Sequence, residues 1–260
     1  MRRHGFSLVE LSIVLVILGL LTGGILAGQS LIRASELRSV TVEYNRYITA
    51  AQAFRDKYFA LAGDMSNATT VWGRLSTSGC RTNSSAAVVT NGVCDGDANG
   101  QLVHDGYSSE PNEFWRELAL AGLIEGNYTG IPGANGQYDS NPGSNVPQSK
   151  ISNTGWTMNY FDNTGHSSAY NYDINYGNAL QFGAYAGGST TVANLKPAEA
   201  WNIDTKMDDG FPASGKLYAR YWNNQCATNN SGTIAATNFD DSYRLSDGTL
   251  QCSLIFKTGL

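Results

Sequence analysis

The first sixty residues constrain the fold more than any other part of the chain. The segment from Leu11 to Gly28 contains no charged residue and is long enough to cross a membrane as a helix. Beyond it, apolar residues continue at three- and four-residue steps, the pattern of one helical face, until Gly63 and Asp64 mark a stop. The sequence therefore predicts one helix from Phe6 to Leu61, roughly 80 Å long at 1.5 Å per residue. Its first half is lipid-soluble and its second half is amphipathic, with the apolar positions Leu37, Val40, Tyr44, Tyr47, Ile48, Ala51, Phe54, Tyr58 and Leu61.

A single carboxylate, Glu10, stands just inside the start of this apolar run. Position alone allows Glu10 to be an interfacial charge that reaches back to the lipid headgroups. The residues before it do not form an ordinary secretory signal, because the basic part is only Arg2, Arg3 and His4 and no small-residue cleavage pattern follows the apolar run. The carboxylate therefore needs a further explanation.

Residues 2–10 resemble the type IV prepilin signature at each of its diagnostic positions. That signature has a short basic leader ending in Gly, then Phe, then a Glu five residues into the mature chain, and here these are Gly5, Phe6 and Glu10. The resemblance implies that a prepilin peptidase cuts between Gly5 and Phe6 and methylates the new amino group of Phe6. It also implies that Glu10 neutralises the Phe6 ammonium of a neighbouring subunit.

The physical chemistry of an apolar filament core agrees with this implied pairing. A carboxylate and an ammonium that are each buried alone cost several kcal/mol, whereas a matched pair is tolerated, so the pair sets the register of neighbours more than it stabilises them. Head-to-tail contacts between identical subunits are heterologous, and a rotation that does not close produces a helical filament.

The resemblance and the hydropathy pattern divide the chain into three parts. Residues 1–5 are a leader peptide, residues 6–62 are the N-terminal helix with its membrane part at about 6–28, and residues 63–260 form a globular periplasmic or extracellular head. Four glycines interrupt the membrane part, and they are explained either by close packing of membrane helices or, from the resemblance, by local unwinding during assembly; they are Gly19, Gly23, Gly24 and Gly28.

The head reads as an α+β domain with a small antiparallel β-sheet and large loops. A helix begins near Pro111 and ends near Gly122, and a short helix runs from Pro197 to about Met207 and is closed by Gly210. Four aromatic, alternating segments are predicted strands, and polar turn-rich loops occupy 125–155 and 223–243; the strands are 155–161, 179–185, 216–222 and 250–256. The segments 63–73, 114–130 and 203–217 also resemble a subgroup of prepilin-like proteins.

The composition suits a secreted β-rich domain. Charged residues make up 15%, and there are 29 glycines. The net charge of −5 argues against broad nucleic-acid binding, which needs a dense cationic surface.

The four cysteines fall into two local pairs without a CxxC spacing. Two disulfides formed in an oxidising compartment, Cys80 with Cys94 and Cys226 with Cys252, are favoured over reactive thiols.

The segment from Gly210 to Leu217, GFPASGKL, is close to a phosphate-binding loop in its spacing. Leu217 replaces the hydroxyl residue that would reach magnesium, and Asp208 and Asp209 would repel a phosphate. We interpret the segment as a turn leading into a strand, not as a nucleotide site.

The segment DGDANGQL matches the first eight positions of a calcium loop of the EF-hand type. The candidate calcium ligands are Asp95, Asp97, Asn99 and Gln101, but position twelve is Gly106, so Asp105, Glu110 or Glu113 would complete the shell only through a different chain path. The alternative is an ordinary Asx-rich turn next to Cys94. A second acidic cluster, with weaker spacing, consists of Asp204, Asp208 and Asp209, and the histidines His4, His104 and His166 are too scattered for a metal triad.

These observations predict a structural subunit of a type IV pilus or secretion pseudopilus that requires no cofactor and is not an enzyme. The expected partners are other pilin subunits, the prepilin peptidase and an inner-membrane assembly machinery. The expected location is the inner membrane before assembly and an extracellular or periplasmic filament afterwards. The alternatives are a minor pilin that primes or decorates a filament, and a membrane-anchored adhesin or binding module.

Overall fold

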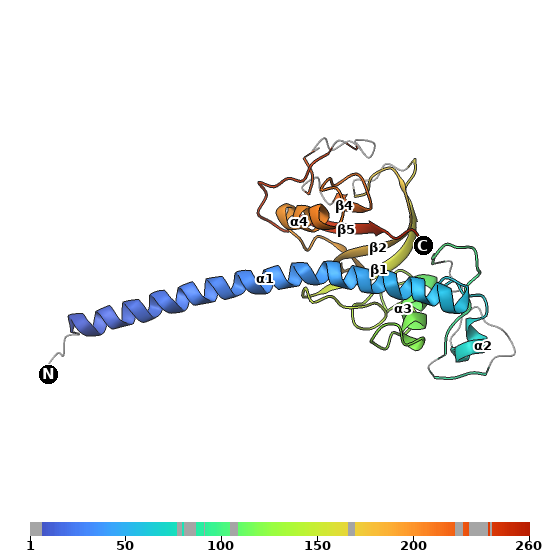
Figure 1. Cartoon of the computed structure of the whole chain (residues 1–260). Coiled ribbons are helices and arrows are strands. Elements are labelled where there is room, and N and C mark those ends of the chain that lie inside the picture. Colours follow the sequence, from blue (N-terminus) through green and yellow to red (C-terminus); the bar gives the residue numbers. More distant parts are fainter. Residues whose placement is uncertain are drawn as a thin grey trace.

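The computed structural model describes residues 7–76, 80, 87–90, 92–104, 109–165, 170–221, 226–228, 239 and 241–260. One long helix, α1 (Leu8–Tyr58), projects far beyond a head that packs against its C-terminal half (Figure 1). The α+β class predicted from the sequence is confirmed.

Helix α1 begins with a capping box between Ser7 and Glu10. The Ser7 amide donates to Glu10 Oε2 over 2.8 Å, and the Glu10 amide donates to Ser7 Oγ over 3.3 Å. The helix ends three residues earlier than predicted, because Phe59 adopts a left-handed conformation with φ 55° and its amide donates to the Arg55 carbonyl oxygen. The turn at Gly63 follows this cap and is not the stop itself.

The two halves of α1 have different surroundings. The apolar window in the first half has a mean hydropathy of 2.4 and is long enough to cross a membrane, and none of it is buried in the structure. In the second half Val40, Tyr47, Ala51 and Phe54 are buried at three-, four- and seven-residue steps. This confirms the predicted change from an apolar to an amphipathic helix.

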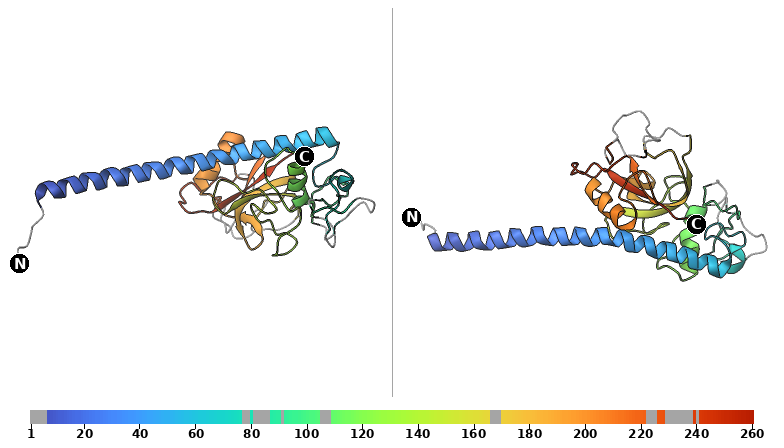
Figure 2. Two further views of the ribbon diagram at one scale, coloured as in Figure 1. Left: turned by 90° about the horizontal axis from the view of Figure 1, so that it is seen from below. Right: turned by 45° about the horizontal axis from the view of Figure 1, so that its top comes forward.

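The head contains one antiparallel sheet of five strands: β1 (Thr154–Asp162), β2 (Asn175–Ala186), β3 (Ser189–Val192), β4 (Leu217–Tyr221) and β5 (Cys252–Lys257). The order is β1-β2-β5-β4, and the short β3 also pairs with β2. The four predicted strands correspond to β1, β2, β4 and β5, whereas β3 was not expected from the sequence. The C-terminal half of α1 crosses one face of this sheet (Figure 2).

Alternation along the strands gives the sheet two apolar faces. Trp156 pairs with Phe182 across β1 and β2, and Leu180 pairs with Phe256 across β2 and β5. These side chains join α1 in the main core, where the Trp156 indole N–H donates to Glu43 Oε2 over 2.7 Å. The opposite face carries a smaller cluster, half of it tyrosines: Tyr172, Tyr176, Ala179, Ala213, Tyr218 and Ile255.

The described part of the head also contains three shorter helices: α2 (Ala68–Trp72), α3 (Glu110–Leu120) and α4 (Pro197–Met207). Helices α3 and α4 agree with the sequence prediction, and α2, which has the β-branched run Thr69–Val71, was not predicted. An ion pair joins α4 to α1: Arg33 Nη2 lies 2.6 Å from Glu199 Oε2. Burial raises the pKa of Glu199, but the bonds from Arg33 and the Lys196 amide outweigh it and hold this pKa below its usual value.

The two disulfides are those predicted from the local pairing of cysteines. Cys80 is bonded to Cys94 with a Cα–Cα distance of 5.3 Å, and Cys226 is bonded to Cys252 at 5.0 Å. The second bond ties the loop after β4 to β5.

Candidate assembly helix and carboxylate cluster

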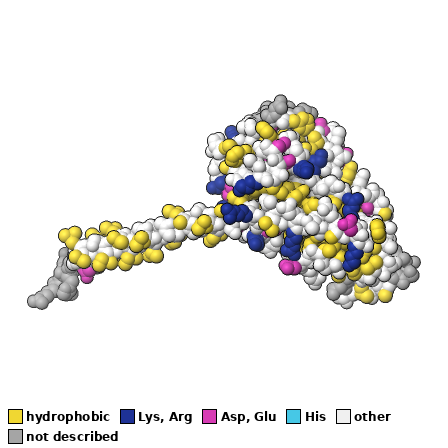
Figure 3. Space-filling model, viewed as in Figure 1, with side chains coloured by type: hydrophobic (Ala, Val, Ile, Leu, Met, Phe, Trp, Pro, Cys, Tyr) yellow, Lys and Arg dark blue, Asp and Glu magenta, His cyan; other side chains and the backbone are white. Residues whose placement is uncertain are grey.

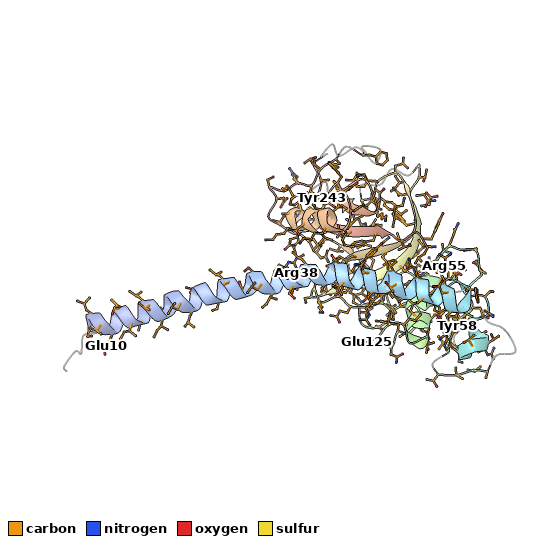
Figure 4. The ribbon with its side chains drawn as sticks, in the orientation of Figure 1. Glu10, Arg38, Arg55, Tyr58, Glu125 and Tyr243 are labelled. Carbon is orange, nitrogen blue, oxygen red and sulfur yellow. A yellow bond between two sulfur atoms is a disulfide. The ribbon has the colours of Figure 1, made fainter. Side chains whose placement is uncertain are left out.

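The predicted cleavage and methylation residues, Gly5 and Phe6, lie outside the described residues, and Glu10 lies in the first turn of α1 (Figure 4). Glu10 is exposed, and its carboxylate accepts from the Ser7 amide, one residue after Phe6. The side chain therefore points back toward the place where the mature N-terminus would begin. A carboxylate there can accept from an ammonium group at the start of a helix.

The apolar residues around Glu10 have no partner among the residues of the head that the structure describes. Leu8 is 86% exposed, and the other large apolar side chains from Val9 to Ile32 are at least half exposed, as the yellow side chains along the N-terminal part of α1 show (Figure 3). Such a surface is stable only in lipid or against other apolar helices. The sequence alone predicts this requirement, and the structure adds that the head does not meet it.

The glycines of this segment are not needed for packing within the chain. A Cβ atom added at Gly19, Gly23, Gly24 or Gly28 would meet nothing within 4 Å. Both explanations from the sequence therefore depend on other molecules or on the assembly process, since the folded head never approaches these positions.

The carboxylate of Asp95 lies elsewhere than the calcium-loop pattern predicted. It is buried and accepts from the Thr69 amide at 2.7 Å and the Thr69 hydroxyl at 2.9 Å. In the same loop the Asn99 amide donates to Asp97 Oδ1, and the Gln101 amide donates to Asn99 Oδ1. These are the bonds of an Asx-rich turn, the alternative that the sequence left open.

Asp97 groups instead with two carboxylates that are distant in sequence. One ligand atom each from Asp64, Asp97 and Glu110 lies within 4.8 Å of the others, and Asp95 is not part of this group. Asp64 and Glu110 are buried, and both accept backbone amides: Asp64 from Asn99 and Gly100, Glu110 from Asp97 and Val103. Asp97 is exposed at the edge. Glu110 was one of the residues that could complete a shell only through a different chain path, and the structure provides such a path.

Burial determines the protonation of this carboxylate cluster. It raises the pKa of Glu110 to about 7, with the negative charges of Asp97 and Asp64 adding to the effect. Burial also raises the pKa of Asp64, against the backbone donors that lower it. Near neutral pH Glu110 therefore exchanges its proton, and a bound cation would favour its ionised form.

Helix α3 buries further charged side chains: Glu113, which is not part of the carboxylate cluster, and Arg116 and Glu117, for which the sequence indicated no role. The Cys94 amide donates to Glu113 Oε1 at 3.0 Å, and the Gly63 amide donates to Glu117 Oε2 at 2.7 Å. Arg116 donates to the Gly92 and Tyr128 carbonyl oxygens, both at 2.6 Å. Burial raises the pKa of Glu113 to about 8 and that of Glu117 well above its usual range. The charged residues of α3 thus hydrogen-bond three loops, at Gly63, at Gly92 and Cys94, and at Tyr128. Their spacing along the helix is the one expected of a face exposed to solvent.

In the second acidic cluster, the carboxylates of Asp208 and Asp209 already accept hydrogen bonds from the segment that follows them. Asp208 accepts the Lys216 and Leu217 amides, and Asp209 accepts the Phe211 amide and the Ser214 hydroxyl. The backbone donors that would hold a phosphate in GFPASGKL therefore hold a carboxylate. The arrangement agrees with the interpretation of this segment as a turn before β4.

The one described histidine is a structural residue. His104 shares a 3.1 Å hydrogen bond with Ser109, and its ring stacks edge-on against Tyr138. His4 and His166 lie outside the described residues.

Comparison with known proteins assigns the N-terminal segment. The family model described as the prokaryotic N-terminal methylation motif matches residues 1–26. The chain therefore carries the prepilin-type signal of type IV pilins and pseudopilins, followed by an apolar helix of membrane-spanning length. No curated protein and no solved structure matches the chain.

Proposed function

We propose that this chain is a structural subunit of a type IV pilus or secretion pseudopilus. The observation that carries the proposal is the methylation motif at residues 1–26, joined to a 51-residue helix whose first half has no partner in the head. The capping box of Glu10 would serve an anchor helix equally well, but a helix that only anchored the head in lipid would need no methylation motif before it. A helix that leaves the membrane to pack among copies of itself needs a group that sets its register.

Processing is the first step of the proposed function. A prepilin peptidase cuts between Gly5 and Phe6 and methylates the Phe6 amine, while the head lies on the far side of the inner membrane. Arg2 and Arg3 remain cytoplasmic, as basic residues flanking a membrane helix do. Intact mass of the surface-exposed protein tests this step: a mature chain that begins at N-methyl-Phe6 supports it, and one that begins at Met1 contradicts it.

Assembly is the second step. The Phe6 ammonium of one subunit pairs with Glu10 of its neighbour, and repetition of this contact builds a filament. The role is structural and not enzymatic, and the partners are further pilin subunits and the inner-membrane machinery that extracts them.

The sharpest test replaces Glu10 with Val and compares two quantities, the protein in the membrane fraction and the yield of sheared filaments. Removing a charge from an apolar helix eases insertion, by up to about 2.5 kcal/mol at the centre of the helix and by less in its first turn, where Glu10 lies. Assembly is impaired, because the neighbour's ammonium enters the apolar core unpaired at a cost of several kcal/mol. Glu10→Asp, which keeps the charge but shortens its reach, should give an intermediate yield.

Normal filaments from the Glu10→Val variant would contradict the register role. They would favour either a minor pilin tolerated within the filament of another protein or a membrane-anchored binding module.

We further propose that the carboxylate cluster of Asp64, Asp97 and Glu110 takes up calcium as a structural ion. Its support is the close approach of three oxygen donors, two of them buried, because calcium prefers carboxylate oxygens. Millimolar calcium should then raise the melting temperature of the wild type and not of Asp97→Ala, which removes the ligand oxygens. Asp209→Ala, at an exposed acidic residue of the other cluster, is the matched control and should keep the wild-type response. An equal response in Asp97→Ala would exclude the site.

A further inference from the structure

Phe59, the residue that caps the C-terminus of α1, exposes a large apolar side chain on the surface of the head. Its side chain is 94% exposed, although the ring is large and apolar. Its backbone is left-handed with φ 55° and is held there by a 2.8 Å bond from its amide to the Arg55 carbonyl oxygen. An L-residue other than glycine rarely adopts this conformation, and a residue kept both strained and apolar on a surface points to a contact with a partner.

A pocket suited to an aromatic ring lies on another part of the head. Its volume is about 320 Å³, and its walls include Trp201 and Phe211, which are 41% and 51% exposed, and Leu245, which is 51% exposed. Tyr243 also lines the pocket and is fixed, because its hydroxyl donates to the buried Asp204 at 2.6 Å. The pocket is therefore open and preformed, with large apolar side chains beside the polar Thr205, Asp209 and Ser242.

The ring and the pocket lie at opposite ends of the head. Arg55 and Tyr58 mark the far end of α1, whereas Tyr243 lies beside α4 at the end that faces the N-terminal half of the helix (Figure 4). Phe59 lies about 39 Å, at 1.5 Å per residue, beyond Arg33, the residue of α1 that contacts Glu199 in α4. A molecule cannot fill its own pocket, but a copy in the same orientation, displaced along the helix axis, brings its pocket toward the ring.

We propose that Phe59 of one subunit inserts into the pocket around Trp201 of a second copy of this chain. The exposed residues before Phe59 are Arg55, Asp56 and Lys57, with a net charge of +1, and the pocket is lined by the exposed Asp209, so the two surfaces carry opposite net charges. Such a contact joins two different patches of identical molecules, and because the copies are displaced along the helix axis it repeats without closing and propagates a filament. This inference rests on the proposed filament function and adds a head-to-head contact to it.

Cysteine trapping in the full chain tests this contact. All four native cysteines are disulfide-bonded, so Phe59→Cys combined with Leu245→Cys introduces the available thiols. In sheared filaments from producing cells, this pair should form a ladder of covalent multimers on non-reducing gels. Phe59→Cys combined with Ser152→Cys, an exposed residue away from the pocket, is the matched control and should give no ladder. The ladder should also disappear in a Glu10→Val background that does not assemble.

Side-chain truncation provides the second readout. Phe59→Ala and Trp201→Ala should each lower filament yield by about tenfold or more, as loss of an aromatic anchor does, with membrane-fraction protein unchanged. Filaments that form normally in Phe59→Ala, without a ladder from the 59/245 pair, would overturn this contact and leave the filament function standing. Wild-type cells that process the chain but build no filament containing it would overturn both.

Discussion

The buried carboxyl group of Glu113 should make the head less stable as the pH rises. Its pKa is raised by burial from 4.5 to about 8, so between these values the folded state holds a proton that the unfolded state has lost. The free energy of unfolding therefore falls with increasing pH, by about 1.4 kcal/mol per pH unit for this one group. Over the whole interval the change is about 5 kcal/mol. Glu117 contributes in the same direction, because its pKa is also raised.

Glu113→Gln isolates this contribution, because the amide resembles the neutral acid and keeps an oxygen acceptor for the Cys94 amide. The free energy of unfolding, measured with urea between pH 5 and 7.5, should fall less steeply with pH in Glu113→Gln than in the wild type. The difference in slope should be about 1.4 kcal/mol per pH unit. A chain that begins at Arg33 is suitable for this assay, because no residue from Ser7 to Ile32 is buried. Glu125→Gln, whose side chain is 94% exposed, is the control and should keep the wild-type slope. If the free energy of unfolding falls equally steeply with pH in the wild type and in Glu113→Gln, Glu113 is not the group that binds the proton in the folded state.

The other predictions concern the stability of the same domain. Phe54→Ala should lower the free energy of unfolding by about 3–5 kcal/mol, because this ring is fully buried, whereas Phe59→Ala in the same region should change it by less than about 1 kcal/mol; similar losses in urea titrations would contradict the core assignment. Replacing Cys226 and Cys252 with serine should cost about 3.5 kcal/mol on a chain-entropy estimate for a 26-residue loop, and an unchanged midpoint would argue that the loop is ordered without the bond. Arg33→Met should cost about 1 kcal/mol or less, because its ion pair is partly exposed, and this loss should shrink at high salt.

The sequence by itself determined the features that depend on local pattern. The helical period of the first sixty residues, the apolar run with Glu10 and the spacing of the cysteines each follow from residues close together in the chain. For the same reason the four main strands and helices α3 and α4 were predicted nearly within their observed bounds. The N-terminal methylation motif is also a local signal, which is why nine residues sufficed to indicate it.

Only the tertiary structure decided which distant residues meet. Asp97 joins Asp64 and Glu110 because the chain folds back on itself, so the predicted ligand Asp95 caps Thr69 instead. The charged face of α3 is indistinguishable by its period from a solvated one, and its burial follows from loops that supply backbone donors and acceptors. A periodic pattern specifies which side chains share a face of an element, but the path of the whole chain determines what that face touches.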